Sequence, residues 1–134
     1  MTLLVPNVGE ADGLNAFVNK AAATNLILKL FSNNITPAET DVDTDYTEAT
    51  FTGYSSITLT GANWTVTPGA PSSAAYAQQQ FTSTAGSQNQ SIYGYFMTRT
   101  TSGNLALAER FTDGPYVIQN NGDFIQVTPN ITMD

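Results

Sequence analysis

The acidic side chains are the residues of this chain that could do chemistry. Glu39, Asp41, Asp43 and Asp45 stand at every second position of one segment. Oxygen ligands at that spacing could converge on a calcium ion. The EF-hand pattern fails, because no glycine follows Asp41 at the required place and Thr52 stands where the pattern needs a glutamate. The spacing therefore favours a solvated acidic loop over a metal site.

Paired carboxylates could also hydrolyse glycosides, and the chain offers Glu48, Glu109, Asp113 and Asp123, although their spacing selects no two of them. The chain has no histidine and no cysteine, so it lacks the usual general base, reactive thiol and soft metal ligands. It also lacks a Gly-x-Ser-x-Gly elbow, a Walker motif and a Rossmann glycine pattern. The sequence therefore predicts a protein that is not an enzyme and needs no cofactor.

Glu109 and Arg110 are neighbours, so on a strand their side chains point to opposite faces. A charge that faces the interior needs a partner, and Arg99 on the adjacent strand could serve Glu109. The sequence predicts a structural ion pair between Arg99 and Glu109. The alternative is a contact of this charged pair with a neighbouring subunit.

Composition restricts the partners of the chain. Its 134 residues fit one domain, 1–134, with a core large enough to need no disulfide. The net charge is −7, and the four cations do not cluster, so neither nucleic acid nor an anionic membrane is an expected partner. Only 11% of residues are charged, and Thr, Ser, Asn and Gln supply most of the polarity. Uncharged polar surfaces cost little to desolvate, so this composition suits permanent protein–protein contact.

One helix is predicted, over residues 9–22. Leu14, Phe17, Val18 and Ala21 recur there at helical spacing and form one apolar face. Acidic side chains at its start and a lysine near its end suit the helix dipole. Residues 1–6 form a short apolar stretch without a basic flank, so no secretory signal is predicted.

The rest of the chain is predicted to be strands. Residues 25–31 alternate, with Leu26, Leu28 and Leu30 on one face, which is typical of a central strand. Further strands are expected at 56–60, 64–67, 74–82, 91–100, 104–110, 116–119, 124–128 and 131–133. The fold class is therefore mainly β, an antiparallel β-sandwich or jelly-roll-like domain with one short N-terminal helix.

Turn residues predict two hairpins. Ser102-Gly103 joins the strands expected at 91–100 and 104–110. Asn121-Gly122 directly precedes an apolar strand, which is the strongest hairpin signal in the chain. Between the strands, a polar loop at 35–50 is longer than an ordinary connection, which predicts a functional or partly mobile segment.

Several short sequence segments of the chain together resemble small virion structural proteins of tailed bacteriophages. The resemblance covers most of the chain from Leu26 onward. It is carried by Leu-Lys-Leu-Phe-Ser-Asn-Asn-Ile-Thr-Pro (28–37), Phe-Thr-Gly-Tyr-Ser-Ser-Ile-Thr-Leu (51–59), Ile-Tyr-Gly-Tyr-Phe (92–96), Leu-Ala-Glu-Arg-Phe (107–111) and Asn-Gly-Asp-Phe-Ile-Gln-Val-Thr-Pro (121–129).

The resemblance implies a β-sandwich subunit of the virion, assembled in the host cytoplasm. We expect a capsid decoration or cement protein, a dimer or trimer that binds the major capsid protein and stabilises the shell. One alternative is a tail, neck or baseplate component. Another is a carbohydrate-binding module for host attachment, with Trp64 and loop tyrosines stacking on sugar rings.

Under the decoration hypothesis the interface should consist of loops and an N-terminal arm. Residues 1–7 could form an arm that adds a strand to a neighbour, or equally the first strand of the chain's own sheet. The expected interface residues are Thr2, Leu3, Leu4, Val5, Pro6, Asn7, Pro37, Glu39, Asp41, Asp43, Asp45, Pro68 and Pro71.

Overall fold

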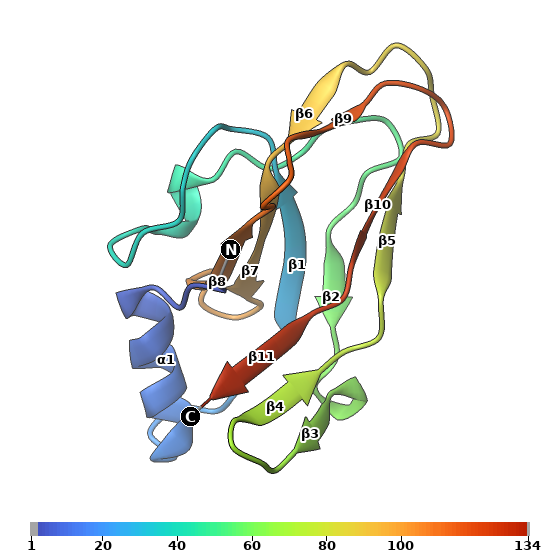
Figure 1. The fold of residues 1–134 in the computed structure, drawn as a ribbon. Coiled ribbons are helices and arrows are strands. Elements are labelled where there is room, and N and C mark those ends of the chain that lie inside the picture. The colour runs from blue at the N-terminus through green and yellow to red at the C-terminus, as the bar shows by residue number, and fades with distance from the viewer. Residues whose placement is uncertain (1–2, 134) are drawn as a thin grey trace.

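The computed structural model describes residues 3–133, which fold into antiparallel sheets with one α-helix (Figure 1). This confirms the predicted mainly-β class. No helix in that range is long and apolar enough to cross a membrane. The elements are α1 (Asn7–Phe17), β1 (Leu26–Phe31), η1 (Asp43–Asp45), β2 (Ile57–Leu59), η2 (Gly61–Asn63), β3 (Thr65–Thr67), β4 (Ser72–Ala75), β5 (Gln79–Thr82), β6 (Gln90–Ile92), β7 (Gly94–Arg99), β8 (Leu105–Arg110), β9 (Tyr116–Ile118), β10 (Phe124–Val127) and β11 (Asn130–Met133).

The largest sheet has the strand order β2-β1-β7-β8. Strand β1 lies inside it, paired with β2 on one side and β7 on the other, as its sequence predicts. Leu26, Leu28 and Leu30 are buried on one face, because every second side chain of a strand points the same way. The predicted β7–β8 hairpin also forms, and Gly103 has the positive φ of 74° that its turn requires.

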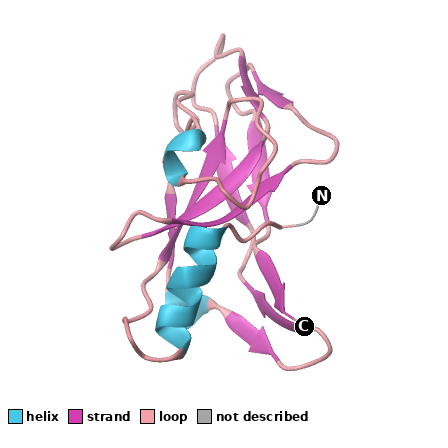
Figure 2. Ribbon diagram, turned by 90° about the vertical axis from the view of Figure 1, so that its left-hand side faces the viewer, coloured by secondary structure: helices cyan, strands magenta, loops and turns pink. Residues whose placement is uncertain are grey.

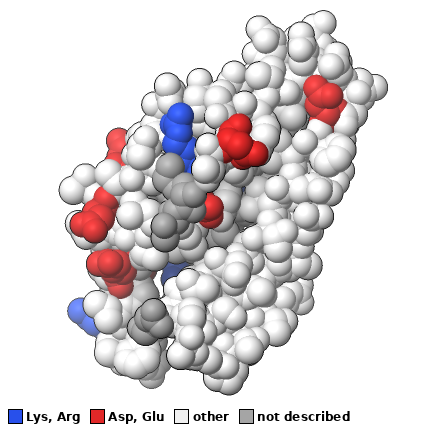
Figure 3. Space-filling model, viewed as in Figure 1, with Lys and Arg blue, Asp and Glu red and all other residues white. Residues whose placement is uncertain are grey.

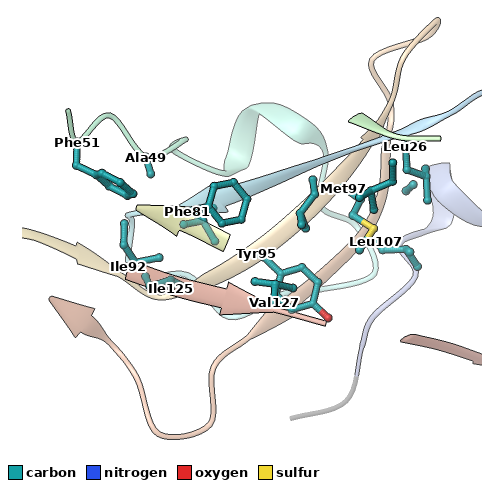
Figure 4. Close-up of a cluster of buried hydrophobic side chains, with 14 of the residues drawn as sticks. Leu26, Ala49, Phe51, Phe81, Ile92, Tyr95, Met97, Leu107, Ile125 and Val127 are labelled. Atoms are coloured by element: carbon teal, nitrogen blue, oxygen red, sulfur yellow. The ribbon is translucent and has the colours of Figure 1, made fainter. Parts of the chain in front are cut away.

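The main core lies between this sheet and the two-stranded sheet β5–β10. Phe81 of β5 and Ile125 and Val127 of β10 contact the same cluster as Tyr95 and Met97 of β7 (Figure 4). Full burial of one such side chain stabilises the fold by about 1.5–3 kcal/mol. The two layers therefore make a sandwich around one apolar core.

The opposite face of the large sheet carries an aromatic cluster. The ring of Tyr46 lies 5.1 Å from the ring of Phe31 and 5.2 Å from that of Phe96, measured between centroids. Tyr46 belongs to the long polar loop at 35–50 and is 5% exposed. The loop is therefore anchored to the sheet through a buried aromatic side chain.

Two strands predicted as continuous are each divided in two. The segment expected at 91–100 forms β6, which pairs with β9, and then β7, which pairs with β1. The segment expected at 74–82 forms β4 in the three-stranded sheet β11-β4-β3 and then β5, which pairs with β10. Both predictions were too long, because within each segment the chain leaves one sheet and joins another.

Helix α1 is shorter than the predicted 9–22. It begins at Asn7 and ends at Phe17, and Asn19 then adopts the left-handed conformation with φ 57°. Asparagine is one of the few residues that adopts this conformation at a helix end. The helix therefore stops before Lys20, and no basic residue lies in its last turn.

The apolar face of α1 does not face the core. Leu14, Phe17 and Val18 are 64%, 88% and 64% exposed. The only buried residue of the helix is Gly9, and a Cβ atom there would lie 2.5 Å from the carbonyl oxygen of Ala106 in β8. The helix thus packs through its glycine-containing first turn.

Leu4, in the segment before helix α1, pairs with the chain's own sheet. Leu4 forms an antiparallel bridge with Ala108 of β8, with N–H to carbonyl distances of 2.9 and 3.0 Å. Of the two alternatives for this segment, the structure shows the bridge to its own sheet. Thr2 lies outside the described residues.

The Asn121-Gly122 hairpin prediction is wrong in one respect. The turn forms, with φ 90° at Gly122 and a hydrogen bond from Asp123 N–H to the Asn120 carbonyl. The two strands on either side of it do not pair with each other, because β9 pairs with β6 and β10 pairs with β5.

Candidate protein interface

The alternating acidic residues organise their own loop. Asp41 Oδ2 accepts hydrogen bonds from Ala38 N–H at 2.9 Å and from the Tyr46 hydroxyl at 2.8 Å. Asp45 Oδ2 accepts from Val42 N–H at 2.8 Å. Residues 3–133 contain no group of three or more His, Cys, Asp or Glu side chains that could hold a metal ion.

The structure does not bring Arg99 and Glu109 together, so that predicted ion pair is wrong. Glu109 lies opposite Tyr95 in the β7–β8 ladder and accepts the hydrogen bond of its hydroxyl. Arg99 is four residues further along β7, about 13 Å away. Its guanidinium donates to the Thr24 carbonyl at 3.2 Å.

The neighbouring Arg110 contacts its own chain. It donates to the Ile35 carbonyl and to Asn34 Oδ1, both at 2.7 Å, and lies 5.1 Å from the centroid of the Tyr93 ring. Among the described residues, the ion pair within 4 Å joins Lys29 and Glu48 at 3.5 Å. Arg110 and Lys29 therefore connect strands of the large sheet to the loop that follows β1.

The four carboxylates considered for catalysis each have a hydrogen-bond partner of their own. Three accept from tyrosine hydroxyls, and the fourth accepts backbone N–H groups at 2.8 and 2.7 Å. The pairs are Glu48 with Tyr54, Glu109 with Tyr95, Asp113 with Tyr116, and Asp123 with Gln119 and Asn120. The hydrogen bonds from Asn120 and Gln119 lower the pKa of Asp123.

Trp64 is not an exposed platform for sugar rings. It is half-buried, and its ring meets that of Tyr76 edge to face, with centroids 5.1 Å apart. Both side chains pack against the main core. The Tyr76 hydroxyl in turn accepts a hydrogen bond from Thr60 N–H at 3.2 Å.

The loop with Pro68 and Pro71 connects β3 to β4 and is exposed at both prolines. Ser72 Oγ closes the loop by accepting from Gly69 N–H at 3.3 Å. This predicted interface loop is therefore the exposed turn of the β3–β4 hairpin.

One side of the molecule carries almost no charged side chains (Figure 3). The sequence contains no Asp, Glu, Lys or Arg between Glu48 and Arg99, and this stretch supplies β3, β4 and β5. Their partners β10 and β11 are also uncharged. We call the surface of β3, β4, β5, β10 and β11 the charge-free face. Figure 3 shows this side as almost entirely uncharged, while acidic residues gather on the side of α1 and the acidic loop.

Apolar side chains are exposed on the charge-free face. Val66 of β3 is 70% exposed, Phe124 of β10 is 54% exposed and Met133 of β11 is 76% exposed. Around them the strands carry Thr, Ser, Gln and Asn. Helix α1, with its own exposed apolar residues, lies at the same end of the molecule as β3, β4 and β11 (Figure 2). This combination is suited to contact with another protein.

No family model, curated protein or solved structure matches the chain. The residues of the charge-free face were not among the predicted interface residues, apart from the adjoining loop of Pro68 and Pro71. The sequence does carry a signal for this face, which is the long run without any charge between Glu48 and Arg99.

Proposed function

We propose that this chain is a non-enzymatic structural protein of a phage virion, a capsid decoration or cement protein that binds the major capsid protein. The charge-free face is the observation that carries the proposal. The proposal is also supported by the resemblance of the sequence segments between residues 28 and 129 to phage virion proteins.

The physical basis is the low cost of burying the charge-free face. A charged side chain moved out of water needs a paired partner, whereas Thr, Ser and Gln need only neutral hydrogen bonds. The core of a protein interface is typically depleted of charged residues. A face of strands without charge, with Val66 and Met133 exposed, therefore fits a long-lived contact.

Attachment would stabilise the shell by mass action. A protein that binds only the assembled lattice shifts the equilibrium toward the assembled state. The acidic side, with most of the net charge of −7, would then face solvent. We propose a dimer or trimer on the shell, with the exposed loop of Pro68 and Pro71 at the edge of the contact.

A charge introduced into the charge-free face tests the proposal. Val66→Lys places one cation on an exposed position of β3, and Thr44→Lys adds the same charge to an exposed position of the acidic loop. An unpaired buried charge costs several kcal/mol. We expect Val66→Lys to bind undecorated shells at least about tenfold more weakly than the unmodified chain.

The matched variant Thr44→Lys should bind as the unmodified chain does. Binding is measured by sedimentation of the protein with shells that lack it. Equal binding of both variants would contradict the use of this face.

A further inference from the structure

Strands β9 and β10 diverge from the turn that joins them (Figure 1). Residues of both strands and of the turn line an open groove. Its volume is about 500 Å³, and its lining consists of consecutive residues on both sides of the turn, 116–118 and 122–126. Tyr116, Val117 and Phe124 line it and are 39%, 51% and 54% exposed. The groove therefore combines apolar side chains with the backbone of two strands.

Strand β10 presents an unpaired edge to this groove. Ser83 N–H donates to the Asp123 carbonyl at 2.8 Å, next to the antiparallel β5–β10 ladder. This bond identifies Asp123 as a residue whose backbone faces β5. Ile125 and Val127 then direct their backbone groups toward β5, because hydrogen-bonded positions recur at every second residue. The N–H and C=O groups of Phe124 and Gln126 point the other way. Among residues 3–133, β5 is the only ladder partner of β10.

We propose that this groove binds an extended segment of a neighbouring protein, which adds a strand to the free edge of β10. The segment would pair with the backbone groups of Phe124 and Gln126. Alternate apolar side chains of the segment would contact Tyr116, Val117 and Phe124, because side chains of a strand alternate between its faces. An exposed strand edge is a template for such pairing.

The acidic residues at the groove predict the charge of the bound segment. Asp123 lines the groove beside the turn that joins β9 to β10, and Asp113 is hydrogen-bonded to the lining residue Tyr116. The Asp123 carboxylate stays ionised, since its pKa is lowered by the N–H groups of Asn120 and Gln119. A lysine or arginine at the corresponding end of the segment would complement it.

A second copy of this chain offers no such segment, because its cations Lys29, Arg99 and Arg110 lie within β1, β7 and β8 of the large sheet and Lys20 closely follows α1. The proposal does not depend on the virion assignment.

The test is selection of binders from a random decapeptide library on the full chain. We expect recovered peptides to alternate apolar and polar residues and to carry a lysine or arginine at one end. On binding, hydrogen exchange at the amides of Phe124 and Gln126 should slow by about tenfold or more, because new hydrogen bonds protect them. The amides of Ile125 and Val127 are the internal control, since their bonds to β5 already exist.

Two substitutions separate backbone pairing from side-chain contact. Gln126→Pro removes the N–H that points to the groove and leaves the β5 ladder intact, so peptide affinity should fall about tenfold. Gln126→Ala keeps that N–H and should bind within about threefold of the unmodified chain.

Peptides methylated on the backbone nitrogens that pair with β10 provide a measurement that needs no variant. They should lose binding, while methylation of the other nitrogens should preserve it. Recovery of no peptide, of peptides without alternation, or of peptides insensitive to these changes would overturn the proposal.

Discussion

At the scale of single residues, tyrosine hydroxyls paired with carboxylates recur through the fold. Tyr46 donates to Asp41 on one face of the large sheet, and Tyr95 donates to Glu109 at the other. Burial raises the pKa of both tyrosines well above its usual range, and the hydrogen bond to the carboxylate raises it further. Each pair lets a carboxylate lie beside apolar packing without a cation.

These pairs predict a loss of stability at alkaline pH. A tyrosine whose pKa is raised in the folded state stabilises the fold fully below the pKa of the unfolded tyrosine, which is 10.0. Above that pH the unfolded state loses its phenolic protons and the folded state keeps them. The free energy of unfolding should fall by up to about 1.4 kcal/mol per pH unit for each tyrosine.

Urea unfolding between pH 8 and pH 11 measures this slope. Tyr95→Phe removes one of the titrating groups, so its slope above pH 10 should be shallower by about one proton's contribution. A free energy of unfolding that stays constant between pH 10 and pH 11 would show that these hydroxyls are not held in the fold as described.

At the scale of elements, helix α1 is held to the sheet by close approach at Gly9. A Cβ atom at Gly9 would lie 2.5 Å from the carbonyl oxygen of Ala106, whereas a Cβ atom at Gly13 would meet no atom within 4 Å. The two glycines occupy the same helix, so they form a matched pair for testing this contact.

Gly9→Ala should destabilise the protein by about 1–3 kcal/mol, because the helix must move away from β8. Gly13→Ala should stabilise it by about 0.5–1 kcal/mol, because alanine favours the helix and nothing opposes its methyl group. Thermal unfolding of the two variants measures the difference. Equal changes in the two melting temperatures would contradict the packing of α1 through its first turn.

The sequence predicts the positions of strands and turns better than it predicts which strands pair with each other. Leu26, Leu28 and Leu30 alternate strictly, and the turn at Gly103 joins strands of matched length, so β1 and the β7–β8 hairpin follow from local pattern alone. The Asn121-Gly122 turn also follows, but the sheet that each flanking strand joins depends on distant residues. The periodicity of Leu14, Phe17 and Val18 indicates a helix but not the environment of its apolar face, which is exposed.

The candidate site was less predictable than the fold. The alternating Asp41, Asp43 and Asp45 have the spacing of possible cation ligands, yet Asp41 and Asp45 accept hydrogen bonds within their own loop. Residues such as Val66 and Met133 carry no motif. They come together with other uncharged residues only when pairing assembles the strands of residues 65–82 and 124–133.

At the scale of the whole molecule, charge divides the protein into two sides. The acidic loop and α1 carry carboxylates, and the sheets β5–β10 and β11-β4-β3 carry none (Figure 3). The division is compatible with the proposed decoration protein, which would attach by its uncharged side and present its acidic side to solvent. Such a protein should cover the shell in a fixed ratio, because every equivalent site on the lattice offers the same contact.

The copy number of this chain in purified particles tests that claim most directly. Quantitative mass spectrometry gives its molar ratio to the major capsid protein. The decoration proposal predicts a ratio of about one, or a simple fraction of one, as lattice symmetry requires. A handful of copies per particle would place the chain in the tail or neck, and its absence from the particles would contradict the virion assignment altogether.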